Sequence, residues 1–178
     1  MSKAALISIR PKWCEKIANG EKTIEVRKTK PKLKTPFKCY IYCTLPKYPH
    51  EDFIATDYPM PQFYGGGKVI GEFTCDRIDR LAPANEPYGI YDIDDDYVLQ
   101  TCLENGALWD YGHGTPLYGW HISDLRIYDA PRELSEFQRA TDPCDSCHAE
   151  YTWECTDCKK FGGDIKRPPQ SWCYVEEG

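Results

Sequence analysis

Short runs rich in β-branched and aromatic residues recur along this chain and constrain its fold more than any other feature. They occupy residues 4–9, 23–27, 38–44, 68–78, 125–128 and 171–175. Fewer segments favour helix: one begins at Pro11 and ends at Gly20, one spans 94–105 with Gly106 as its stop, and a short one covers 133–139. Many short strands with few helices predict a small, mostly β barrel with helices packed on its side.

Residues 23–27 (TIEVR) alternate apolar and polar side chains. A period of two predicts a half-buried strand, with its apolar side chains on one side and Thr23, Glu25 and Arg27 on the other. A glycine inside the fourth run, Gly71, indicates a β-bulge.

The formal charge is divided unevenly along the chain. The net charge of −6 suggests at first that nucleic acid is excluded as a partner. However, residues 1–47 hold 12 Lys and Arg against 3 acidic residues, whereas residues 48–178 hold 10 against 25. Such asymmetry is typical of a protein that binds a polyanion with one face. The alternative is two solvated faces that attract each other within the fold, and a charge run alone favours that alternative.

The ten cysteines fall into two groups. Six occur singly in apolar surroundings and are expected to be buried, inert thiols: Cys14, Cys39, Cys43, Cys75, Cys102 and Cys173. The other four form two CxxC hooks separated by seven residues: Cys144, Cys147, Cys155 and Cys158. Four thiolates at this spacing favour a tetrahedral, structural Zn²⁺ over a redox-active CxxC or reduced surface cysteines. His148 follows the first hook and is an alternative ligand.

No apolar stretch approaches the ~18 residues that a membrane-spanning helix requires, and the N-terminus lacks a signal-peptide layout. These features predict a soluble, cytoplasmic protein without a membrane partner. We expect three parts: a barrel over 1–140, a four-cysteine zinc-binding insertion over 141–165, and a terminal strand over 166–178 that returns to the barrel.

Six segments carry a family resemblance, and they are 6–13 (LISIRPKW), 17–28 (IANGEKTIEVRK), 40–42 (YIY), 67–72 (GKVIGE), 125–128 (LRIY) and 169–172 (PQSW). Together they resemble the ASCH (activating signal cointegrator homology) domain of the PUA-like superfamily, in its phage and bacterial forms. The resemblance implies an α+β fold, a small mixed β-barrel flanked by helices. The cysteine segment is not part of the family core, and we interpret it as a zinc-knuckle insertion. The resemblance also implies a cleft between the barrel and the first helix that takes RNA, another single-stranded nucleic acid or a modified nucleoside.

The resemblance and the residue types together indicate a binding mouth at the ends of two neighbouring strands. Basic side chains there can donate to phosphate or a base edge, and aromatic rings can stack on a base. Core packing is an equal alternative for Trp13. Glu25 either accepts from an exocyclic amine or holds Lys22 or Arg27 in place. The expected nucleic-acid-binding residues are Ser8, Arg10, Lys12, Trp13, Lys22, Thr23, Glu25, Arg27, Tyr42, Ser171 and Trp172.

Some ASCH proteins are amidohydrolases that remove the acetyl group from N4-acetylcytidine, and residues 20–27 (GEKTIEVR) resemble their Gly-x-Lys-Thr-x-Thr-x-Arg motif. Glu25 stands where that motif has its nucleophilic threonine, so the same reaction cannot be repeated unchanged. If the chain is such an enzyme, Lys22 and Glu25 are the expected catalytic residues, with Glu104 as a candidate for the glutamate that the motif takes from a later helix.

Two further functions remain open. A ribonuclease, as in other ASCH relatives, needs an acid–base pair, for which Lys22 and Glu25 aided by His113 or His121 are the candidates. A protein-interaction module would use the acidic surface near Asp92–Asp96 to mimic nucleic acid or to dock a basic partner. Binding of RNA or of a modified nucleotide is the leading hypothesis, because the GEKTIEVRK segment lies within the basic part of the chain.

Overall fold

The computed structural model describes residues 2–45, 66–84, 89–140 and 163–178, which form an α+β fold. The four cysteines of the two hooks, and His148, lie outside these residues. The elements are β1 (Lys3–Ile9), α1 (Pro11–Ala18), β2 (Ile24–Arg27), β3 (Phe37–Cys43), β4 (Lys68–Leu81), α2 (Asp95–Thr101), α3 (Asn105–Gly112), β5 (Leu117–Arg132), the 3₁₀ turn η1 (Leu134–Glu136), β6 (Gln138–Arg139), β7 (Gly163–Asp164) and β8 (Trp172–Glu176). No helix in this part of the chain is long and apolar enough to cross a membrane.

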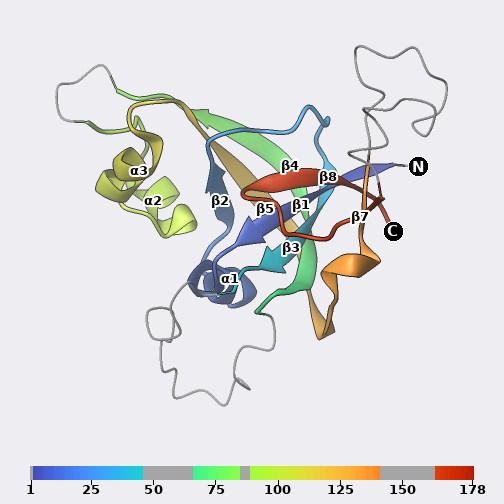
Figure 1. Ribbon diagram of the computed structural model, residues 1–178. Coiled ribbons are helices and arrows are strands. Elements are labelled where there is room, and N and C mark those ends of the chain that lie inside the picture. The colour runs from blue at the N-terminus through green and yellow to red at the C-terminus, as the bar shows by residue number, and fades with distance from the viewer. Residues whose placement is uncertain (1, 46–65, 85–88, 141–162) are drawn as a thin grey trace, which may run out of the picture.

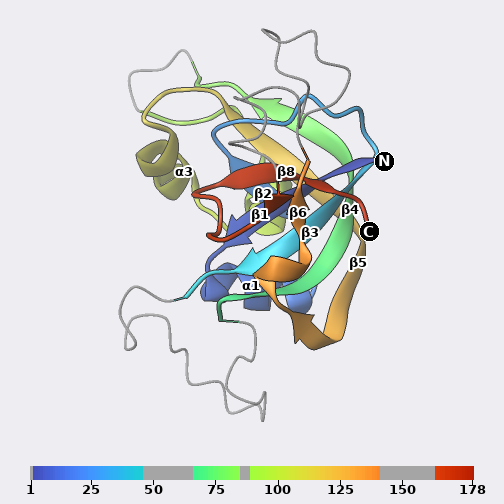
Figure 2. The same cartoon turned by 45° about the vertical axis from the view of Figure 1, so that its right-hand side comes forward.

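The strands join in one sheet with the order β2-β5-β4-β3-β1-β8-β6-β7. β1 and β3 run parallel, and the other strand pairs of the described residues are antiparallel. Figures 1 and 2 show the sheet curled, with the long strands β4 and β5 bent and the end of β1 brought near β2. The expected α+β class with a mixed, barrel-like sheet is confirmed.

Strands β4 and β5 curve where their register shifts. One shift lies between Val69 and Gly71 in the pairing of β4 with β5. A Cβ on Gly71 would lie 2.5 Å from the carbonyl oxygen of Arg126, so no side chain fits there unless the neighbouring backbone moves. The bulge expected at Gly71 is therefore confirmed, and it adds to the curl of the sheet.

Three groups of apolar side chains form the core, and two of them attach helices to the sheet. The buried face of α1, with Cys14 and Ile17, packs on residues of β1, β3 and β4 that include Ile41. The other side of β1 and β3 carries a second cluster, which contains Tyr42. A third cluster, which contains Leu108, joins the helix pair α2 and α3 to the ends of β4 and β5.

The single cysteines depart from the prediction at two positions. Cys102 and Cys173 are half-buried, because one ends α2 and the other lies in β8 near the edge of the sheet. The fully buried thiols are Cys14, Cys39, Cys43 and Cys75. Burial raises the pKa of the Cys75 thiol to about 12, so this thiol stays neutral in the core.

The predicted helix over 94–105 is wrong at its end. α2 stops at Thr101 because Cys102 has a left-handed backbone conformation, with φ of 54°. A second helix, α3, then begins at Asn105, so that Gly106 lies inside a helix and does not stop one.

Two later elements also differ from the sequence-based expectation. β5 begins at Leu117, well before the predicted run 125–128. Gly119 and His121 interrupt the alternation of apolar residues there, so the sequence does not indicate a strand. Pairing with β2 and β4 nevertheless makes these residues part of β5. In place of a helical segment over 133–139, the chain forms one 3₁₀ turn and then the short strand β6.

Candidate functional site

Three charged side chains, Lys22, Glu25 and Arg27, are buried on β2 and the turn before it. Their exposed fractions are 2%, 6% and 8%. β5 pairs with one edge of β2. The end of α2 meets the residue before β2, where the Thr23 N–H donates to the Gln100 carbonyl at 2.9 Å. The prediction of a half-buried strand is therefore wrong, because both faces of β2 are covered.

Glu25 joins the two cations, and we call these three residues the buried charge trio. Glu25 Oε1 lies 2.9 Å from Arg27 Nη2, and Glu25 Oε2 lies 3.4 Å from Lys22 Nζ. Lys22 Nζ also donates to the Thr101 carbonyl at 2.6 Å, and Arg27 Nη2 donates to the Ser8 carbonyl at 2.6 Å. The trio thus ties β2 to β1 and to the end of α2 through charge-assisted hydrogen bonds.

The trio has an excess of one positive charge, because it holds two cations and one carboxylate. Burial lowers the pKa of Lys22, and the attraction of Glu25 opposes that shift. Arg27 Nε is buried and has no hydrogen-bond partner among the described residues. An uncompensated positive charge away from bulk water favours an anionic ligand beside it.

A cavity of about 650 Å³ opens beside the trio, within the size range of small-molecule sites. The end of β1 and the start of α1 contribute Ser8, Arg10 and Trp13 to its lining. Arg10 is exposed, so its guanidinium is available to a ligand at the mouth. In Figure 1 the end of β1 lies close to β2 and to α1, which all contribute to the lining.

Trp13 presents an aromatic ring to this cavity. Lys22 Nζ lies 5.2 Å from the ring centroid, and Lys12 Nζ lies 4.6 Å from it, both within cation–π range. The half-buried ring also packs on the core cluster beneath α1. Trp13 therefore packs on the core and also lines the cavity, and its stacking on a base stays a prediction.

Residues that the sequence did not indicate form the rest of the lining. α3 contributes Ala107 and Tyr111, with Leu103 just before it, and residues 168–170 contribute from the segment before β8. Leu103, Ala107 and Tyr111 are spaced by four, which is the signal of one helix face. Interpreting Gly106 as a helix stop hides that signal.

Seven of the eleven expected nucleic-acid-binding residues surround the cavity. They are Ser8, Arg10, Trp13, Lys22, Glu25, Arg27 and Ser171. The residues come from β1, the start of α1, β2 with the turn before it, and the distant segment before β8. The curl of the sheet brings them together.

The other four expected residues do not line the cavity. Alternation along β3 turns Tyr42 into the second core cluster, on the other side of the sheet from α1. Trp172 packs on Trp120, with 5.7 Å between their ring centroids. Lys12 extends into solvent beside the Trp13 ring, and Thr23 lies in the turn that meets α2.

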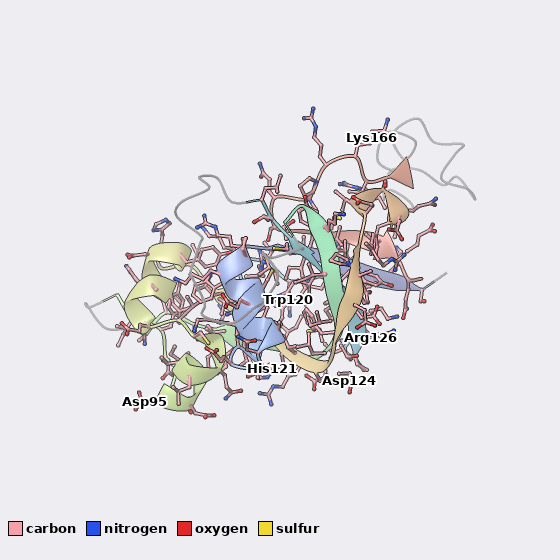
Figure 3. All side chains as sticks on the ribbon, turned by 90° about the horizontal axis from the view of Figure 1, so that it is seen from below. Asp95, Trp120, His121, Asp124, Arg126 and Lys166 are labelled. Atoms are coloured by element: carbon pink, nitrogen blue, oxygen red, sulfur yellow. The ribbon has the colours of Figure 1, made fainter. Side chains whose placement is uncertain are left out.

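Apart from Lys22 and Glu25, the residues considered for other functions do not line the cavity. His121 Nε2 is 2.6 Å from Asp79 Oδ2, and His113 is the C-cap of α3. Glu104 is exposed and precedes α3. Figure 3 places Asp95, in the acidic run at the start of α2, at the outer edge of the molecule.

The sequence matches no protein-family model and no curated protein. Among solved structures, the chain is similar to the ASCH protein from Zymomonas mobilis, with a TM-score of 0.51, 19% identity, and coverage of 98% of this chain and 88% of that one. A tyrosine-to-phenylalanine mutant of the same protein gives a TM-score of 0.58 at 19% identity, with coverage of 99% and 92%. The fold of the chain is that of the ASCH domain, as the resemblance implied.

Proposed function

We propose that this chain binds a ribonucleotide, free or within RNA, in the cavity beside the buried charge trio. The observation that carries the proposal is the meeting of three features in one cavity: the excess positive charge of the trio, the exposed guanidinium of Arg10 and the ring of Trp13. Positive charge suits a phosphate, and an aromatic ring suits a planar base. The ASCH fold supports the proposal, because ASCH domains are associated with nucleic-acid and nucleoside ligands.

In this proposal the residues of the site have different tasks. Arg10 binds the phosphate at the mouth, and the Trp13 ring stacks on the base. Both carboxylate oxygens of Glu25 are engaged, one by each cation of the trio. Of its two expected roles, holding the cations is therefore favoured over accepting from a base amine.

Hydrolysis of a nucleoside is the second candidate, and the lowered pKa of Lys22 is the observation in its favour. The geometry favours binding over this reaction. Glu25 is fully engaged within the trio, and the hydroxyl of Ser8 donates to the Pro169 carbonyl at 2.7 Å. Neither group is thus poised to activate water or to attack an acyl carbon.

Titration calorimetry with uridine 5′-monophosphate (UMP) and with uridine tests the proposed site. We expect Arg10→Gln to lower the affinity for UMP by roughly tenfold, the size of one charged hydrogen bond, and to leave the affinity for uridine unchanged. Trp13→Ala should lower both affinities by a comparable factor, because stacking does not depend on the phosphate.

Arg126→Gln is the matched control, since Arg126 is exposed and lies on β5 away from this cavity. It removes the same charge and should leave both affinities unchanged. Failure of the wild-type protein to bind UMP, or an equal loss in Arg126→Gln, would contradict the proposed site.

We also propose, from the spacing of the cysteines alone, that the two hooks bind one structural Zn²⁺. Among the residues that the structure describes, no group of three or more His, Cys, Asp or Glu is placed to hold a metal. Mass spectrometry of the metal content should give one zinc per chain, and Cys144→Ser with Cys147→Ser should reduce it at least tenfold. Cys102→Ser is the control and should keep the zinc. A zinc content that the double variant does not change would refute the site.

A further inference from the structure

We propose that the ligand is one nucleotide of a single-stranded nucleic acid, whose chain continues from the cavity along a basic strip. The strip is the segment 28–34 that follows β2, with the exposed residues Lys28, Lys30, Lys32 and Lys34. This inference rests on the proposed function and narrows it, because a free nucleotide would have no use for the strip.

The strip begins at the cavity. Arg27, the last residue of β2, lines the cavity, and Lys28 is the next residue in the chain. Lys28 Nζ lies 5.0 Å from the ring centroid of Tyr111, which itself lines the cavity and is 37% exposed. Figure 1 shows the segment leaving the end of β2 near the helix pair and crossing to β3. A strand bound in the cavity would thus meet Lys28 first.

Aromatic side chains accompany the lysines along the strip. Lys30 Nζ lies 5.6 Å from the ring centroid of Tyr118. Two hydrogen bonds attach the strip to β8. Trp172 Nε1 donates to Thr29 Oγ1 at 2.9 Å, and the Lys32 N–H donates to the Tyr174 hydroxyl at 2.8 Å. Positive charges interleaved with aromatic rings are the pattern by which proteins bind single strands.

The lysines of the strip differ in their partners from several lysines elsewhere in the chain. Lys16, Lys38 and Lys68 pair with carboxylates at 3.0, 3.9 and 2.8 Å. Within the described residues, Lys28 and Lys30 form no such ion pair, although the chain as a whole has a net charge of −6. Cations left without carboxylate partners in an acidic chain favour a polyanionic ligand over mutual attraction of two solvated faces.

The spacing of the charges suits a strand. Residues two apart in a chain are at most about 7 Å apart, which is close to the separation of successive phosphates in an extended single strand. Each phosphate bound by a lysine releases counterions, so the affinity for a strand falls with salt in proportion to the number of contacts. The slope of log affinity against log salt therefore reports how many lysines contact phosphates of the bound strand.

Fluorescence anisotropy with a labelled uridylate octamer, measured across salt concentrations, tests the inference beside calorimetry with UMP. For Lys28→Gln with Lys30→Gln, we expect octamer affinity to fall on the order of tenfold at 0.1 M salt. The slope of log affinity against log salt should become shallower by about 1.4, from roughly 0.7 for each of two lost phosphate contacts. The affinity for UMP should not change, because neither lysine lines the cavity.

Lys38→Gln with Lys68→Gln removes the same charge from elsewhere on the sheet and should leave the slope unchanged. An equal loss of octamer affinity in this control would refute the proposal that the basic strip binds the strand. So would an octamer that binds no more tightly than UMP, or a duplex of the same length that binds as tightly as the single strand. Each of these results leaves the cavity proposal intact, whereas failure of UMP itself to bind would refute the proposed function.

Discussion

Replacement of Glu25 by alanine is expected to lower the free energy of unfolding by about 3–5 kcal/mol, the cost of leaving buried charges without their partner. Glu25 provides the carboxylate contacts of both Lys22 and Arg27, at 3.4 and 2.9 Å, and all three side chains are at most 10% exposed. Without it, two like charges would face each other in a place with little water. Urea denaturation at neutral pH measures the loss.

Glu21→Ala is the matched control for this prediction, because it removes the same charge one residue away from Lys22. Glu21 pairs with Lys16 at 3.0 Å, but the two side chains are 54% and 32% exposed. Such a pair contributes less than about 1 kcal/mol. Glu25→Gln should fall between the two, since its amide oxygen can still accept from one cation. A loss for Glu25→Ala no larger than for Glu21→Ala would show that water reaches the trio.

Local patterns along the chain account for most of the fold. The strands at the N-terminus and the helix between Pro11 and Gly20 follow from apolar runs and from turn residues at their ends. The bulge at Gly71 follows equally from a glycine within a strand. These features depend on a few neighbouring residues, so the sequence contains the information that predicts them.

Burial at the site depends instead on elements that meet from far apart in the chain. The alternation of residues 23–27 predicts which side chains of β2 share a face, but nothing in it says that helices cover the face of Val26 or that the face of Glu25 lies on the side of the buried Trp120. The same limit applies to Tyr42, because the direction of β3 relative to α1 decides which side of the sheet its ring occupies. The contribution of α3 to the cavity lining could not be predicted for a local reason, because Gly106 inside that helix suggests a helix end.

Replacing the whole trio, as Lys22→Met with Glu25→Leu and Arg27→Met, is expected to restore most of the stability that Glu25→Ala loses. No charge would then remain buried without a partner, and apolar side chains of similar length would fill the same space. The unfolding free energy of the triple variant should exceed that of Glu25→Ala by about 2 kcal/mol or more. The carbonyls of Thr101 and Ser8 would lose their charged donors, so full recovery is not required.

The triple variant should at the same time lose UMP binding by at least about a hundredfold, which corresponds to roughly 2.7 kcal/mol. Its cavity keeps Arg10 and Trp13 but lacks the excess positive charge next to the ligand. Calorimetry with UMP and urea denaturation of the same sample separate the two effects. If stability is restored and UMP binding is lost, the buried charges contribute to ligand binding and lower the stability of the fold. A triple variant less stable than Glu25→Ala would mean that the trio chiefly holds β1, β2 and α2 together. Unchanged UMP binding in the triple variant would mean that the nucleotide binds elsewhere.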